Sequence, residues 1–148
     1  MAAKPSDRPE IQVFDHIEAI EYLLRASITR KLPVGLTYPQ YEVLNHLIRS
    51  GRPRTPAAIA KALQMTKGAI TNTLQRLEVR DLVRIAADKT DRRKKQVSVS
   101  PQGLAAYGQT MTALRPQLET LRGGFTEREF RDVLPFLSAL RTWLEESR

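Results

Sequence analysis

The chain has 148 residues, the usual size of one domain, and folding at this length buries enough surface for a core without disulfides or metals. It contains no cysteine, which excludes disulfides and thiol-based redox sensing, and no apolar run approaches the roughly 20 residues of a membrane helix. The first ten residues are polar and lack the apolar stretch of a secretory signal, so we expect a cytoplasmic protein.

Positive charge is concentrated in one third of the sequence. The net charge is +8, and residues 49–95 carry 13 basic and 4 acidic side chains, whereas the rest of the chain carries 11 basic and 12 acidic ones. Clustered Lys and Arg side chains indicate a polyanionic partner, most often nucleic acid, because they release condensed counterions from phosphates. The alternative is a basic face that contacts only solvent.

Apolar spacing predicts an amphipathic helix over residues 11–30, after a flexible tail at residues 1–10. The apolar face of this helix consists of Val13, Ile17, Ile20, Leu24 and Ile28. Residues 31–36 include a proline and a glycine and should end it. Thr37 and Gln40 have the spacing of a capping box, which predicts a second helix that Gly51 ends.

Two short helices and a hairpin should follow. Thr55 with Pro56 behind it predicts a helix through Leu63, and Thr66 is the expected N-cap of another helix that ends near Arg80. Alternating residues then predict a β-hairpin with a basic tip at residues 88–95, whose inward positions are Val83, Ile85, Val97 and Val99. This order is typical of a winged helix-turn-helix.

The last third predicts two helices, which Ser100 with Pro101 and the capping box of Thr126 with Glu129 should start, separated by Gly123 and Gly124. The first carries a heptad seam of Leu104, Tyr107, Met111, Leu114, Leu118 and Leu121. The second carries a stripe of Phe130, Val133, Leu137, Leu140 and Leu144. Pro116 and Pro135 fall inside these helices, where we expect kinks.

The apolar stripes of the outer helices are too wide for one small domain to cover. We therefore expect a homodimer that forms through the N- and C-terminal helices. The interface residues that we expect are Val13, Ile17, Ile20, Leu118, Leu121, Phe130, Leu137, Leu140 and Leu144.

The helix that Thr66 caps has two different faces. Ile70, Leu74 and Leu77 should point inward, and the outward face consists of Lys67, Gly68, Thr71, Asn72, Gln75 and Arg76. Such side chains hydrogen-bond base edges or phosphates, and a glycine lets the backbone approach a groove closely. We expect Thr71, Asn72 and Gln75 to read bases, and Lys67 and Arg76 to bind phosphates. The alternative is an ordinary solvated helix face.

The hairpin tip is the second expected DNA contact, through Lys89, Asp91, Arg92, Arg93, Lys94 and Lys95. Its five cations can reach a phosphate backbone or place an Arg in a narrow minor groove. A carboxylate repels phosphate, so we expect Asp91 to orient a neighbouring Arg by a charge-assisted hydrogen bond.

The stretch LEVRDLVRIAADKTDRRKKQVSVSPQG, residues 77–103, resembles the wing of the multiple antibiotic resistance regulator (MarR) family. The resemblance covers about residues 11–146, and Asp91 and Arg93 match the Asp and second Arg of the family's wing. It implies a dimer, a winged helix-turn-helix between the dimerisation helices, and often a small-molecule pocket where the two regions meet. Pro135 departs from the family pattern, and the lack of Cys excludes the thiol sensing of some members.

We therefore expect a mainly α fold with a small β-hairpin wing (α+β). Its expected parts are an N-terminal dimerisation helix and loop at 11–36, a winged helix-turn-helix at 37–100 and C-terminal dimerisation helices at 101–148. The expected function is that of a transcriptional regulator that binds double-stranded DNA as a homodimer on a pseudo-palindromic operator, and the family resemblance implies that it is a repressor. The family resemblance implies release by a small aromatic or anionic effector.

Three further expectations concern small molecules and partners. The helix that borders both the DNA-binding and the dimerisation regions begins with Tyr38, Tyr41 and His46. These side chains either line an effector pocket or pack against neighbouring residues. We expect no catalytic residues, cofactor or metal, since His16 and His46 lie in no metal-ligand spacing and no phosphate-binding Gly-rich loop is present. The alternative function is a winged-helix module that docks an acidic protein.

Overall fold

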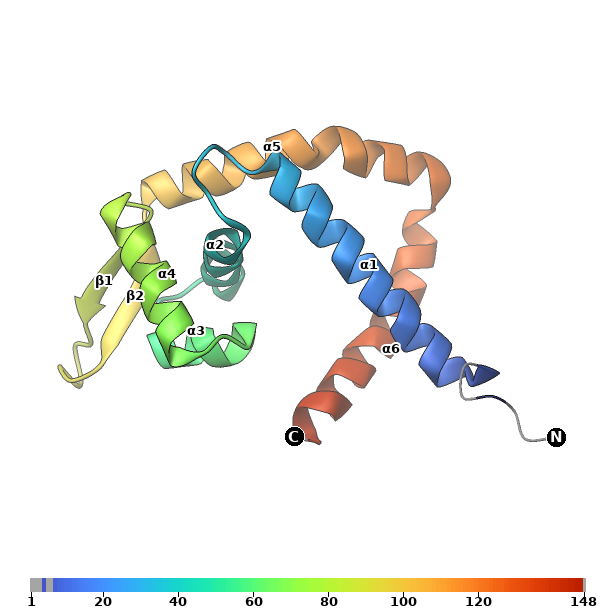
Figure 1. The fold of residues 1–148 in the computed structure, drawn as a ribbon, viewed down its shortest axis with the longest axis horizontal. Helices are drawn as coiled ribbons and strands as arrows, with labels where there is room; N and C mark the ends of the chain where they lie inside the picture. The colour runs from blue at the N-terminus through green and yellow to red at the C-terminus, as the bar shows by residue number, and fades with distance from the viewer. Residues whose placement is uncertain (1–3, 5–6, 148) are drawn as a thin grey trace. The chain divides into compact units, whose positions relative to one another are not determined.

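A computed structural model describes residue 4 and residues 7–147 of the chain. Within these residues the fold is mainly helical with one two-stranded antiparallel sheet, as the sequence predicted (Figure 1). The elements are α1 (Pro9–Lys31), α2 (Tyr38–Ser50), α3 (Pro56–Leu63), α4 (Lys67–Val79), β1 (Val83–Ala87), β2 (Lys95–Val99), α5 (Pro101–Gly124) and α6 (Glu127–Glu146). Two compact units, Met1–Thr112 and Ala113–Arg148, divide the chain, and α5 contributes to both.

Side-chain caps start α2, α3 and α4 where the sequence predicted them. Thr37 Oγ1 accepts from the Gln40 amide, and Gln40 Oε1 accepts from the Thr37 amide at 3.2 Å, which completes the capping box of α2. Thr55 and Thr66 cap α3 and α4 by accepting from backbone amides three residues on, each at 3.1 Å. Gly51 ends α2 in the left-handed region with φ +66°, which favours glycine.

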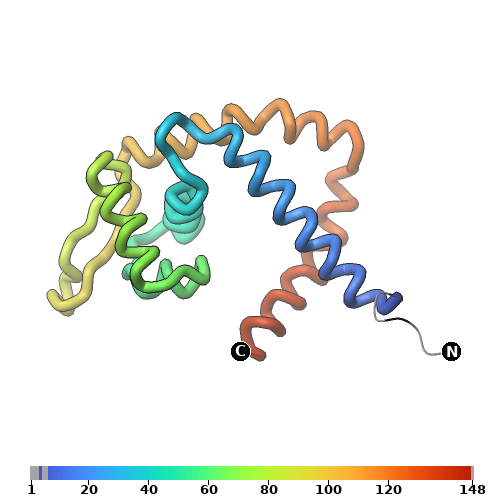
Figure 2. The backbone as a smooth tube through the Cα atoms, viewed as in Figure 1, coloured from blue at the N-terminus to red at the C-terminus, as the bar shows by residue number. Residues whose placement is uncertain are grey.

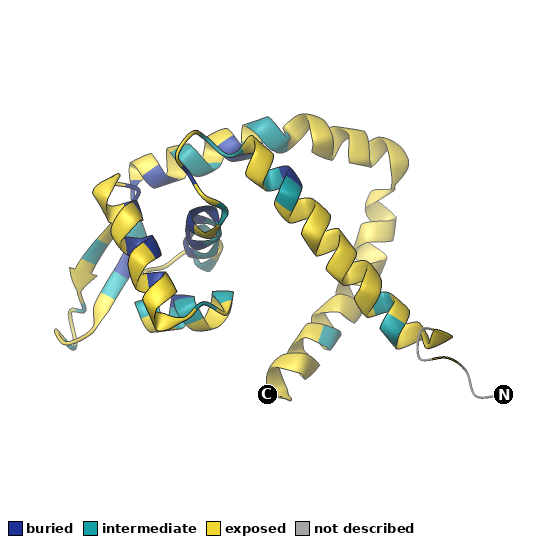
Figure 3. Cartoon of the chain, viewed as in Figure 1, coloured by how far each residue is buried: buried dark blue, intermediate teal, exposed yellow. Residues whose placement is uncertain are grey.

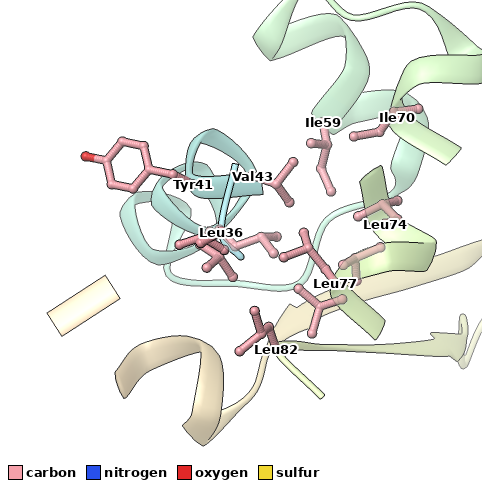
Figure 4. Packing of buried hydrophobic residues seen from close by; sticks show 12 residues of the cluster. Leu36, Tyr41, Val43, Ile59, Ile70, Leu74, Leu77 and Leu82 are labelled. Carbon is pink, nitrogen blue, oxygen red and sulfur yellow. The ribbon is translucent and has the colours of Figure 1, made fainter. Parts of the chain in front are cut away.

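The hydrophobic core lies between α2, α3, α4 and the hairpin. Val43, Leu44, Ile59 and Leu77 are completely buried, and each such side chain contributes about 1.5–3 kcal/mol through burial. Figure 4 shows Ile59 of α3 next to Ile70 of α4, with Leu74, Leu77 and Leu82 further along the same cluster. The predicted inward face of α4 is therefore confirmed, with Thr73 as an additional buried residue.

The hairpin is held against this core by its register and by one extra bridge. Val83 pairs with Val99 and Ile85 pairs with Val97, which puts the predicted apolar positions on one face. Arg54, just before α3, forms a β-bridge with Val97 through backbone hydrogen bonds of 2.9 and 2.7 Å. The backbone passes from α4 through a short turn into β1, as Figure 2 shows. Helix α4 and the hairpin therefore pack against the same hydrophobic core.

The first half of α5 packs against the core of the first unit partly through residues outside the predicted heptad seam. Leu104 is half exposed, whereas Gly103 and Thr110 are buried. A Cβ atom on Gly103 would lie 2.1 Å from the Leu82 carbonyl oxygen, so the absence of a side chain permits this contact. Tyr107 and Met111 of the seam pack against the core, whereas Leu104 does not.

Two predicted boundaries also differ in the structure. Helix α1 begins at Pro9, so the last two residues of the expected tail are helical; residues 1–3 and 5–6 of that tail lie outside the described residues. Gly123 and Gly124 belong to the last turn of α5 and do not separate the helices. The break falls at Phe125 and Thr126, because the capping box of Thr126 with Glu129 starts α6 directly afterwards.

The two prolines lie inside continuous helices, Pro116 in α5 and Pro135 in α6.

Most of α6 is exposed, as the yellow colour of its ribbon in Figure 3 shows, whereas dark blue residues gather on α2 and the inner side of α4. None of the helices in the described part of the chain combines the length and apolarity of a membrane span.

Candidate nucleic-acid interface

The outward face of α4 is fully accessible, as predicted. The polar residues expected on it are all exposed: Thr66, Lys67, Gly68, Thr71, Asn72, Gln75 and Arg76. Three of their side chains, those of Thr71, Asn72 and Arg76, already take part in hydrogen bonds along the helix. The Thr71 hydroxyl donates to the Lys67 carbonyl oxygen at 2.8 Å, and Arg76 Nε donates to Asn72 Oδ1 at 3.2 Å.

The wing carries its cations on an ordered turn between β1 and β2. Lys89, Arg92, Arg93, Lys94 and Lys95 are exposed; Lys95 is the first residue of β2, and the others lie in the connection. Asp91 accepts from Arg93 Nε at 3.1 Å and from Nη2 at 3.3 Å, and it also accepts from the Arg93 amide. The prediction that Asp91 orients a neighbouring Arg is confirmed.

Asp88 is a second organising carboxylate of the wing, and the sequence analysis did not identify it. It accepts from Gln96 Nε2 and from the amide and hydroxyl of Thr90, each at 2.8 Å. These hydrogen bonds hold the pKa of Asp88 far below its ordinary value of 3.8, and the bond from Gln96 has the largest effect. Asp at the start of a turn commonly accepts from amides two residues on, which is the signal that could have revealed it.

Two grooves border α4. One of about 730 Å³ lies between the start of α3, the start of α4 and the wing; its lining includes Thr55, Pro56, Lys67, Thr71, Arg93 and Lys95. The other, of about 460 Å³, is lined by Asn72, Gln75, Arg76, Arg80 and the loop residue Gly35, with Gln40 and Val79. The first groove therefore brings together part of the expected site, namely Lys67 and Thr71 of α4 with Arg93, Lys94 and Lys95 of the wing, and it adds the start of α3, which sequence reasoning did not include. The expected base readers Asn72 and Gln75 line the second groove instead.

The expected effector residues separate into two places. Tyr38 and Tyr41 lie together with ring centroids 5.8 Å apart, and Tyr41 stacks on Tyr107 at 6.0 Å. Arg25 lies over the Tyr38 ring at 5.0 Å, and the Tyr107 hydroxyl donates to Asn45 Oδ1 at 3.1 Å. Burial raises the pKa of Tyr38 and Tyr41.

His46 is placed differently from this tyrosine cluster. Its Nε2 atom is buried and has no hydrogen-bond partner among the described residues. Burial, and then the positive charge of Arg54, lower the pKa of His46 below its ordinary value of 6.5. Its environment is therefore that of a packed histidine next to the Arg54 bridge.

The expected dimer residues carry apolar surface that this chain leaves largely uncovered. Val13 and Leu140 are half-buried, and the others, Ile17, Ile20, Leu118, Leu121, Phe130, Leu137 and Leu144, are exposed. The same helices expose further large apolar side chains, among them Leu23, Leu24 and Trp143.

Acidic and histidine side chains do not form a metal site in the part of the chain that the structure describes, since no group of three or more lies close enough together. The sites that the geometry does build are the cationic surface around α4 and the aromatic cluster of Tyr38, Tyr41 and Tyr107.

Comparison with known proteins agrees with this architecture. No curated protein sequence matches the chain significantly. The transcriptional regulator BldR from Sulfolobus solfataricus is similar in structure, with a TM-score of 0.74, 23% identity, and coverage of 98% of this chain and 99% of that chain. A mutant of S. aureus MepR bound to an oligodeoxyribonucleotide has a TM-score of 0.62 at 23% identity, covering 89% and 97%.

PcaV, a transcriptional regulator from Streptomyces coelicolor in complex with its natural ligand, has a TM-score of 0.65 at 18% identity, and both chains are covered completely. These likenesses extend over nearly the whole chain and show its fold. Residues 34–94, which include α2, α3, α4, β1 and the wing turn, match the model of the MarR family. Over this winged-helix region, the chain is similar to the MarR family.

Proposed function

We propose that this chain is a cytoplasmic regulator of transcription that binds double-stranded DNA sequence-specifically, and not an enzyme. The observation that carries the proposal is the exposed polar face of α4 next to an exposed wing with five cations, three of which line a groove together with Lys67 and Thr71 of α4. An α-helix fits the major groove of B-DNA, and a cationic hairpin beside it can contact the adjoining backbone or minor groove. The structural likeness to MepR, which was solved with an oligodeoxyribonucleotide, supports this reading.

We further propose that the active form is a homodimer. The apolar side chains exposed on α1 and α6, such as Ile20, Leu24 and Trp143, support it, because a soluble monomer rarely exposes so many. A two-fold dimer would present its two α4 helices about 34–36 Å apart, one helical turn of DNA. The operator would then be pseudo-palindromic.

Repression that a small aromatic or anionic molecule relieves is the third part of the proposal. The tyrosine cluster supports it, because the rings of Tyr38, Tyr41 and Tyr107 offer stacking surfaces and Arg25 supplies a cation beside them. PcaV, which is similar in fold, was solved in complex with its natural ligand, and this supports a ligand-binding site in the present chain. His46 is not part of this proposed site.

The experiment that tests DNA recognition is selection of bound sequences from random double-stranded DNA with the full chain. A single pseudo-palindromic sequence should emerge. A dimer with about six phosphate contacts should lose on the order of a thousandfold in affinity between about 50 and 200 mM salt, while it still prefers the selected sequence.

The alternative partner, an acidic protein docked on the same cations, gives a different result. Its binding would also weaken with salt, but no DNA sequence would be enriched over random DNA. An unenriched pool would therefore contradict the proposed function. Repeating the selection with candidate aromatic acids tests the effector, since a true effector lowers the affinity for the selected sequence.

A further inference from the structure

Two hydrogen bonds on the exposed face of α4 limit what its side chains can recognise. The Thr71 hydroxyl donates to the Lys67 carbonyl oxygen at 2.8 Å, so its hydrogen is used and only its lone pairs and methyl group face outward. Arg76 Nε donates to Asn72 Oδ1 at 3.2 Å. The acceptor of Asn72 is therefore engaged, and the Asn72–Arg76 pair presents N–H donors: Asn72 Nδ2 and the two Nη groups of Arg76.

This pair lies in the groove of about 460 Å³, whose lining also includes Gln75, Arg80 and the loop residue Gly35. Arg80 Nη1 donates to the Gly35 carbonyl oxygen at 2.6 Å, which directs Arg80 to the loop. Arg76 is held by a side chain of its own helix instead, so its guanidinium stays on the face that the proposed DNA would contact.

The bases differ in what they offer such a donor pair. In the major groove guanine presents two acceptors, N7 and O6, whereas adenine presents one acceptor and one donor, and cytosine presents a donor. Reading adenine with both ends of the Asn72 amide would require Oδ1 to accept from the base with its second lone pair, and the two free Nη groups of Arg76 would then find only one acceptor on that base. A pair of donors fits the acceptor edge of guanine without rearrangement.

We propose that the Asn72–Arg76 pair is a guanine-binding site, in which Arg76 donates to the O6 and N7 atoms and Asn72 both orients Arg76 and donates beside it. The inference rests on the proposed DNA-binding function and adds the base that this part of α4 reads. It replaces the expectation that Arg76 binds phosphate. The planar guanidinium of Arg suits two parallel hydrogen bonds, and its anchored Nε reduces the freedom lost on binding.

The test uses the operator selected from random DNA and versions of it in which each guanine in turn is replaced by 7-deazaguanine. That base keeps its Watson–Crick pairing but lacks the N7 acceptor. For the wild-type chain, one guanine in each half-site should be sensitive, with a loss of about tenfold in affinity. The measured quantity is the ratio of affinities for the intact and the substituted operator.

Arg76→Gln should reduce this ratio to less than about twofold, and Asn72→Ala should reduce it to an intermediate value. Arg49→Gln is the matched control, because Arg49 Nε donates to Asn45 Oδ1 at the same 3.2 Å on α2. It removes the same charge and the same kind of hydrogen bond, and it should keep the tenfold ratio. Circular dichroism confirms that each variant is folded.

Three results would overturn the inference or the function beneath it. If Arg76→Gln weakens binding to intact and substituted operators equally, Arg76 contacts phosphate and the guanine site is wrong. If no guanine of the operator is sensitive in the wild-type chain, the guanine site is wrong although DNA recognition stands. If the wild-type chain enriches no sequence at all, the proposed function itself fails.

Discussion

Carboxylates set the positions of the cations at the tip of the wing. Asp91 binds the guanidinium of Arg93 through two hydrogen bonds, and Asp88 fixes the turn before it through Thr90 and Gln96. An Arg held in this way loses less conformational freedom on binding than a mobile one. The wing therefore presents Arg93 in a prepared position, at the cost of two negative charges, those of Asp88 and Asp91, near the proposed DNA contact.

Arg93→Ala should weaken the binding of selected and random DNA by about the same factor, on the order of tenfold, because a phosphate contact carries no sequence information. The slope of log affinity against log salt should fall by about one. Asn72→Ala should instead erode mainly the preference for the selected sequence. Titrations of both variants against both DNAs measure this, with Arg84→Ala on β1 as a control for the loss of one charge. Equal loss of discrimination in the two variants would contradict the assigned roles.

His46 gives the fold a pH dependence of predictable sign. Its pKa in the folded chain lies below the ordinary value of 6.5, because burial and Arg54 disfavour the charged form. Below about pH 6.5 the unfolded chain therefore binds the proton more readily than the folded one, and stability falls as the pH falls. At higher pH His46 is neutral in both the folded and the unfolded chain, so its protonation no longer lowers the stability.

Replacing His46 with Gln should make the melting temperature less dependent on pH between about pH 7.5 and about pH 5.5. His16 is the matched control, since it is exposed on α1, and His16→Gln should leave the dependence as it is in the wild-type chain. Thermal melts followed by circular dichroism give the comparison. A wild-type dependence retained by His46→Gln would show that other groups cause it.

At the scale of elements, one glycine sets how closely α5 approaches the end of α4 and the hairpin. A Cβ on Gly103 would lie 2.1 Å from the Leu82 carbonyl oxygen and 2.8 Å from Val99 Cγ2. The Leu82 carbonyl also accepts from the Ser100 amide at 3.1 Å, so it cannot move away without losing that bond. The first turn of α5 is thus fixed to the winged-helix core by backbone contact.

Gly103→Ala should lower the free energy of unfolding by about 3 kcal/mol, as overpacking of a tight contact does. Gly108→Ala, one turn and a residue further along the same helix, is the control. A Cβ there meets no atom within 4 Å, so the better helix propensity of Ala should leave stability unchanged or raise it by up to about 1 kcal/mol. Denaturant unfolding of both variants measures the two effects, and equal results would contradict the packing account.

The elements show which features the sequence alone could predict. The starts of α2, α3, α4 and α6 were predictable, because Thr37, Thr55, Thr66 and Thr126 cap these helices with their own side chains and the signal is local. The start of α1, which no side chain caps, was predicted two residues too late. The buried face of α5 was not, since its depth depends on Gly103 meeting a distant carbonyl group. A leucine seam is also ambiguous between the core and an interface between chains.

For the candidate site, too, the sequence predicted which residues would be exposed but not which hydrogen bonds they would form. The outward residues of α4 follow from helical spacing, and the cations of the wing from composition. The roles of Asp88 and of the Asn72–Arg76 hydrogen bond depend on side-chain geometry in the folded turn and on the helix surface, which spacing does not encode. The separation of His46 from the tyrosine cluster likewise follows from packing around α2.

At the scale of the whole molecule, the proposed dimer should depend on the apolar side chains of α1 and α6. Leu137→Glu places a negative charge on the exposed apolar stripe of α6. Burying that charge in the dimer interface without a cation beside it is unfavourable. The variant should therefore sediment as a monomer, while the wild-type chain sediments as a dimer. Val34→Glu is the matched control, because Val34 is 98% exposed in the α1–α2 loop and should leave the dimer intact.

Loss of the dimer should also change how DNA is bound. A monomer offers one α4 helix to one half-site, so Leu137→Glu should protect a single half-site in footprinting and bind the full operator far more weakly. The wild-type chain should protect two half-sites about one helical turn apart, because the two-fold axis of the dimer fixes the separation of its α4 helices. Inserting about five base pairs between the half-sites turns the second one to the opposite side of the duplex and should abolish tight binding by the dimer alone. A wild-type chain that tolerates this insertion would bind its half-sites independently, and the symmetric arrangement would then be wrong.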